Sequence, residues 1–66
     1  MNIIVNGIEK NFSSNLTIET LLINLGHNNK KVAVEVNEEI ITRSQIKNKL
    51  IVDGDRIEII KAVGGG

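Results

Sequence analysis

The sequence predicts one small α+β domain, in which a mixed sheet of four to five strands packs on a single helix. Three observations indicate this class: a hairpin signal at the start, one amphipathic helical stretch after it, and alternating strand patterns in the second half. The chain has 66 residues, and a domain of this size buries only about 60% of its unfolded surface. We therefore expect one core, one domain over residues 1–61, and a flexible tail over residues 62–66.

The first predicted element is a β-hairpin within residues 1–12. Its turn is Asn6-Gly7, and both residues tolerate the positive φ that a type I′ turn requires. A two-residue turn at this position sets Val5 opposite Ile8 and gives the hairpin one mostly apolar face. We expect this face to cover the core.

A helix follows the hairpin. Thr17 is the predicted N-cap, and Glu19 in the first turn interacts favourably with the helix dipole. Gly26 is the predicted residue after the C-cap, where a positive φ is common. The apolar residues between these ends share one helix face: Ile18, Leu21, Leu22 and Leu25.

The second half of the chain reads as strands separated by turns. Val32–Val36 alternates as a half-buried strand does, and Glu39–Ile41 is a second, short strand. Ser44 is the predicted cap of a single helical turn, and residues 53–55 form the turn before a last strand over Arg56–Lys61. This order of elements predicts a β-grasp, a mixed sheet curled around one helix.

Composition argues against several classes of function. Eight basic residues balance eight acidic ones and the only aromatic residue is one phenylalanine, so no nucleic-acid partner is expected. No apolar run approaches the ~20 residues of a membrane span and no signal peptide is visible, which predicts a cytoplasmic protein with no membrane partner. The absence of cysteine excludes a disulfide framework, a thiolate metal site and a cysteine persulfide.

No catalytic or metal-binding group is expected within the chain. His27 is a single histidine in a polar loop, and Asp53 with Asp55 are too few carboxylates for a calcium loop. Glu38 and Glu39 are neighbours in sequence and point to opposite faces of a strand. We therefore expect no enzyme activity, no bound metal and no bound cofactor.

The last three residues are Gly64-Gly65-Gly66. Glycine is the costliest residue to order, so such an ending is typical either of a frayed terminus or of a segment that enters a narrow active site. Fully extended, residues 62–66 span about 17 Å. The α-carboxylate of Gly66 is ionised at neutral pH and is a candidate nucleophile toward ATP.

Three parts of the sequence occur together in a known family: VEVN at residues 34–37 followed by IITR at residues 40–43, DGDRIEI at residues 53–59, and AVGGG at residues 62–66. With them, essentially the whole chain resembles the ThiS family, the ubiquitin-like β-grasp sulfur carriers of thiamine biosynthesis. Two positions depart from the family pattern. Thr42 stands where a proline is usual, and Ile46 stands where a tryptophan is frequent, which affects the expected packing in the middle of the chain.

The resemblance implies a protein cosubstrate. A ubiquitin-activating-type adenylyltransferase would use Mg-ATP to convert the Gly66 carboxylate to an acyl-adenylate, and sulfur from a cysteine desulfurase would displace AMP and leave a thiocarboxylate. Thiazole synthase would then take this sulfur into the thiazole ring. Val63, Gly64 and Gly65 would thread into these partners.

Three apolar residues lie out of phase with the inward positions of their strands: Ile4, Ala33 and Ile60. The first and last strands of a β-grasp are parallel neighbours, so we interpret these residues as a candidate docking patch on the open face of the sheet. The alternative interpretation is the scattered exposure of single apolar side chains that small proteins commonly show.

Three other functions stay open on sequence grounds. The small sulfur-carrier subunit of molybdopterin synthase shares the chemistry but is usually longer. A ubiquitin-like modifier would be joined through Gly66 to lysines of other proteins. A non-covalent β-grasp binding module would not need the glycine tail.

Overall fold

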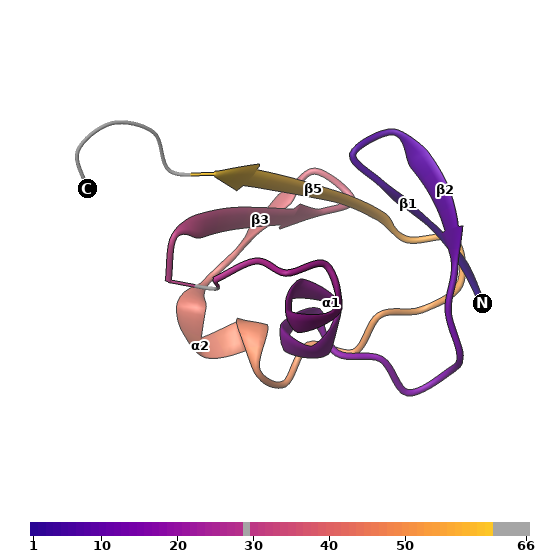
Figure 1. The fold of residues 1–66 in the computed structure, drawn as a ribbon, viewed down its shortest axis with the longest axis horizontal. Helices are drawn as coiled ribbons and strands as arrows, with labels where there is room; N and C mark the ends of the chain where they lie inside the picture. The colour runs from indigo at the N-terminus through magenta and orange to yellow at the C-terminus, as the bar shows by residue number, and fades with distance from the viewer. Residues whose placement is uncertain (29, 62–66) are drawn as a thin grey trace.

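The computed structural model describes residues 1–28 and 30–61, which form one five-stranded sheet with a helix packed against one face (Figure 1). The order of strands across the sheet is β2-β1-β5-β3-β4. Along the chain the elements are β1 (Asn2–Val5), β2 (Ile8–Asn11), α1 (Ile18–Asn24), β3 (Val32–Val36), β4 (Glu39–Ile41), α2 (Arg43–Ile46) and β5 (Arg56–Lys61). The predicted α+β class, with a mixed sheet on one main helix, is confirmed.

The β1–β2 hairpin turns at the predicted residues. Asn6 has φ 49° and Gly7 has φ 81°, the positive values that a type I′ turn needs at both central positions. Val5 lies opposite Ile8, as the two-residue turn predicts. This register directs Val5 into the core, where it is buried.

Helix α1 begins and ends where its capping residues predict. The Thr17 hydroxyl accepts a hydrogen bond from the Thr20 N–H at 3.2 Å, which confirms the N-cap. At the other end Gly26 has φ 79°, and the His27 N–H donates to the Leu22 carbonyl at 2.9 Å. This is the hydrogen-bond pattern of a Schellman motif, which satisfies a carbonyl that the last helical turn leaves unpaired.

Helix α2 begins two residues earlier than expected. The prediction that Ser44 caps it is wrong, because Thr42 is the N-cap and Ser44 lies inside the helix. The Thr42 N–H donates to Gln45 Oε1 at 2.9 Å. Gln45, three positions after the cap, therefore accepts from the N-cap backbone as in a capping box. The family's usual proline position is therefore occupied here by a capping threonine.

The core lies between α1 and the inward face of the sheet. Its buried apolar residues are Ile3, Val5, Leu16, Ile18, Leu21, Leu22, Val32, Val34, Val36, Ile46, Ile51, Ile57 and Ile59. The segment before β5 closes one end of this core, because the Ile18 N–H donates to the Lys49 carbonyl at 3.0 Å and the Ile51 N–H donates to the Leu16 carbonyl at 2.8 Å.

The two faces of α1 predict opposite sensitivities to truncation. Leu22 is 0% exposed, so Leu22→Ala is expected to lower the free energy of unfolding by about 2–5 kcal/mol through lost burial and a residual cavity. The adjacent Ile23 is 69% exposed, and Ile23→Ala is the matched control, with an expected change within about 0.5 kcal/mol. Urea denaturation followed by circular dichroism measures both values. Equal effects would contradict this assignment of the helix faces.

Candidate functional site

The described chain leads to the predicted tail through β5, whose last residue is Lys61. The residues assigned to activation and threading, Gly66 with Val63, Gly64 and Gly65, lie outside the described residues, and their roles stay predictions. The structure instead defines the surroundings of Lys61, directly before the predicted tail.

Strand β5 is paired on both sides. Antiparallel β3 accompanies it over almost its whole length, and Val32 lies opposite Lys61 at the end. Parallel β1 accompanies only its first part, where Ile4 lies opposite Arg56. The first and last strands of the domain are therefore neighbours, as the predicted β-grasp requires, but β1 stops before β5 does.

The side chain of Asn6 continues the pairing of β5 beyond the end of β1. Its Oδ1 accepts a hydrogen bond from the Ile59 N–H at 2.7 Å, and its Nδ2 donates to the Ile59 carbonyl at 3.3 Å. An asparagine amide has the donor and acceptor of a peptide group, so it replaces a missing strand residue. Sequence analysis assigned Asn6 only to the turn, because this contact joins residues 53 positions apart.

The start of β5 is held by a second asparagine. Asn37 accepts a hydrogen bond from the Arg56 N–H at 3.0 Å and donates to Asp55 Oδ1 at 2.9 Å. Asp55 is only 7% exposed, and its other oxygen accepts from the Val52 N–H at 2.9 Å. The Asp55 carboxylate therefore orders the entry into β5, because a buried polar group must keep its hydrogen bonds.

The candidate docking patch is distributed along the outer face of the sheet. Ile60 is 51% exposed, and its register partner on β3 is Ala33, so these two residues are neighbours. Ile4 is half-buried beside Arg56, four positions or about 13 Å along β5 from Ile60. Sequence analysis missed Ile40, which is 75% exposed and pairs with Glu35 on the same face.

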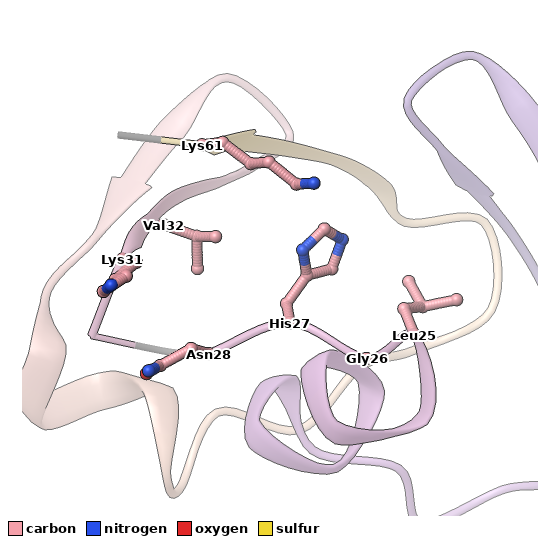
Figure 2. A pocket seen from close by; sticks show the side chains of 7 residues that line it. All are labelled: Leu25, Gly26, His27, Asn28, Lys31, Val32 and Lys61. Carbon is pink, nitrogen blue, oxygen red and sulfur yellow. The ribbon is translucent and has the colours of Figure 1, made fainter. Parts of the chain in front are cut away.

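A hollow of about 320 Å³ lies beside Lys61, between the end of β5 and the C-terminal end of α1 (Figure 2). The imidazole of His27 and the side chain of Lys61 point toward one another across it (Figure 2). The lining residues are Leu25, Gly26, His27, Asn28, Lys31, Val32 and Lys61. His27 is thus half-buried at a hollow, where sequence analysis expected a surface loop residue.

The described residues give no sign of a metal centre. Within residues 1–28 and 30–61, no three or more histidine, aspartate or glutamate side chains gather as metal ligands would. Each buried side-chain nitrogen and oxygen in these ranges has a hydrogen-bond partner, so none is left to signal a ligand. Over the same ranges, no helix has the length and apolarity needed to cross a membrane.

Comparison with protein families identifies the chain. The sequence model of the ThiS family matches residues 3–66, which include the sheet except for Asn2 of β1, and also the glycine tail. The chain belongs to the ThiS family. The family resemblance expected from residues 34–37, 40–43, 53–59 and 62–66 is confirmed.

The relatives of this ThiS-family chain include a sulfur carrier protein and two thiazole synthases. The sulfur carrier protein ThiS of Bacillus subtilis is 44% identical over 50 residues, which are 76% of each chain. A thiazole synthase of Paramagnetospirillum magneticum is 46% identical over all 66 residues, and one of Magnetococcus marinus is 36% identical. The chain spans only 20% of the length of each of these two thiazole synthases.

Solved ThiS structures share the fold. The crystal structure of the thiamine biosynthesis protein ThiS from Geobacter metallireducens superposes with a TM-score of 0.86 at 32% identity, over the whole of both chains. The solution structure of the thiamine biosynthesis protein from the same organism gives a TM-score of 0.80. The ubiquitin-like β-grasp assignment is therefore confirmed.

The double role of Asn6 predicts that its side chain stabilises β5. Asn6→Gly keeps the positive φ of the turn but removes both hydrogen bonds to Ile59, and is expected to lower the free energy of unfolding by about 1–3 kcal/mol. Asn15→Gly is the matched control, because Asn15 also has a positive φ, 64°, and is exposed. Amide hydrogen exchange is expected to accelerate at Ile59 in the first variant only. Unchanged protection of Ile59 would contradict the role.

Proposed function

We propose that this chain is a sulfur carrier of thiamine biosynthesis, which delivers sulfur for thiazole formation from a thiocarboxylate at Gly66. The family match over residues 3–66 carries the proposal, because it joins the β-grasp domain and the terminal glycines in one family. The names of relatives support it: one is a sulfur carrier protein of Bacillus subtilis and another a thiamine biosynthesis protein of Geobacter metallireducens.

The proposed chemistry begins at the Gly66 carboxylate. One of its oxygens attacks the α-phosphorus of Mg-ATP held by a ubiquitin-activating-type adenylyltransferase, and pyrophosphate leaves. The acyl-adenylate then has a good leaving group in AMP, which the free carboxylate lacks. Sulfur delivered at the oxidation level of sulfide, by a cysteine desulfurase system with a thiol reductant, displaces AMP and leaves the thiocarboxylate.

In this proposal the chain supplies the reacting group and its position, and the partners supply catalysis. The β3 pairing at Lys61 and the Asn6 hydrogen bonds at Ile59 give the domain a firm last strand. The five residues after Lys61 reach about 17 Å when extended, which suffices to place Gly66 inside a partner while the domain docks outside. We therefore propose a carrier that is not itself an enzyme.

Thiazole synthase is the proposed acceptor of the sulfur. Two proteins with that name contain a segment similar to the whole of this chain, within a polypeptide about five times as long. Two modules joined in one chain meet at a high effective concentration, which would favour the encounter of a carrier with its acceptor. This arrangement supports thiazole synthase as a partner of the present chain.

The thiocarboxylate is tested by intact mass spectrometry of the chain isolated from its native cells without oxidants. The expected result is a mass gain equal to one oxygen exchanged for sulfur, mapped to Gly66 and trapped by alkylation. Deletion of Gly65 and Gly66 is the control, and is expected to abolish the mass gain and thiamine-independent growth while the circular dichroism spectrum stays unchanged.

Other outcomes of this test support the other functions. Gly66 joined to a lysine of another protein would make the chain a modifier. A thiocarboxylate that serves molybdopterin formation and not thiazole formation would make it the molybdopterin synthase subunit. Full function after the deletion would indicate a non-covalent binding module.

The outer sheet face provides a second prediction. Ile60→Asp is expected to leave the fold intact, because Ile60 is exposed, and to weaken binding to the adenylyltransferase or thiazole synthase about tenfold or more. Ile23→Asp is the matched control, since Ile23 is also an exposed isoleucine but lies on α1. Isothermal titration with folded variants measures both affinities. Equal affinity of Ile60→Asp and the unsubstituted chain would remove Ile60 from the docking patch.

A further inference from the structure

The end of the molecule beside Lys61 is basic, although the formal net charge of the chain is +0. Two adjoining hollows share Lys31, Val32 and Lys61 in their linings, and Lys30 and Arg43 also line the second. Among the described residues, no aspartate or glutamate lines either hollow. We call Lys30, Lys31, Arg43 and Lys61 the basic rim.

The register of the sheet assembles the basic rim from three separate parts of the chain. Lys30 and Lys31 precede β3, and Lys61 ends antiparallel β5, so all three lie at the same end of the sheet. Arg43 follows β4, and its Nη2 donates a hydrogen bond to the Lys30 carbonyl at 2.7 Å. Half of the chain's eight basic residues therefore surround the point where the predicted tail begins.

The hollow inside the rim suits a carboxylate on a short apolar stem. Leu25 and Val32 provide apolar lining, and Lys31, Lys61 and the polar His27 also line the hollow (Figure 2). Acidic groups of the same sheet lie further along β5 and β3, where Glu58 is opposite Glu35. An acidic segment of a partner is thus attracted by the basic rim and repelled by Glu35 and Glu58. This difference favours the orientation in which the acidic segment lies at the rim.

We propose that the basic rim binds an acidic segment of the adenylyltransferase that activates this chain, an inference that rests on the proposed function. Any enzyme that reaches Gly66 comes within about 17 Å of Lys61 and so faces the rim. Complementary charge at that place raises the rate of encounter and sets the approach. A nucleic acid fits less well, because the described residues of the rim and its hollows include no phenylalanine, tyrosine or tryptophan on which bases could stack.

The test is a steady-state assay of pyrophosphate exchange by the adenylyltransferase of the same organism, with this chain as varied substrate. The double variant Lys31→Glu with Lys61→Glu is expected to raise KM about tenfold or more at ~0.05 M salt with kcat nearly unchanged, and the difference is expected to shrink at ~0.5 M salt. The KM of the neutral variant Lys31→Gln with Lys61→Gln is expected to lie between that of the unsubstituted chain and that of the double glutamate variant. Circular dichroism checks that each variant is folded.

The matched control is Lys47→Glu with Lys49→Glu, which changes the net charge equally. Both lysines are exposed, and the Lys49 carbonyl accepts from the Ile18 N–H at the N-terminal end of α1, whereas His27 follows the C-terminal end. The expected change in KM for this control is less than about twofold. Equal KM values for rim and control variants, or a rim effect insensitive to salt, would overturn the inference alone. No exchange with the unsubstituted chain would overturn both the inference and the proposed function.

Discussion

The central position of β5 in the sheet is the constraint on which the rest of the structure depends. The last strand, β5, lies between β1 and β3 and runs parallel to β1. Parallel neighbours need a long crossover connection, and here the chain between β1 and β5 provides it. Helix α1 lies within that crossover and covers the inward face. In the sequence, the predicted glycine tail therefore follows the strand that the domain holds from both sides.

Two asparagines adapt the domain to this constraint. β1 and β5 share only a short parallel ladder, and the Asn6 amide extends it to Ile59. At the other end of β5, Asn37 connects the β3–β4 turn to Arg56 and to the buried Asp55. Both asparagines have a positive φ, 49° and 51°, so each serves a tight turn and a distant strand at once. Local turn chemistry and long-range pairing are coupled through the same side chains.

The sheet has its core residues on one face and the candidate docking residues on the other. Residues that alternate inward on β5, Ile57 and Ile59, are buried in the core, while Ile60 faces outward beside Ala33. Charged residues are separated along the strands: the basic rim lies at the end of β5, and the Glu35–Glu58 pair lies further along the outer face. The proposed carrier function would benefit from this separation, since the outer surface is free of the packing demands of a core.

The sequence by itself determined the fold class, the hairpin and both ends of α1, because each depends on contacts within a few residues or on simple periodicity. Asn6-Gly7, Thr17 and Gly26 are examples, and all three adopt the expected geometry. Ser44 was misassigned because two hydroxyl residues compete there, and only Thr42 has a glutamine three positions later. Only the tertiary structure decided the Asn6–Ile59 and Asn37–Asp55 contacts, the separation of Ile4 from Ile60, and the basic rim. These depend on strand register, which brings together side chains that are far apart in the sequence and that no local pattern connects.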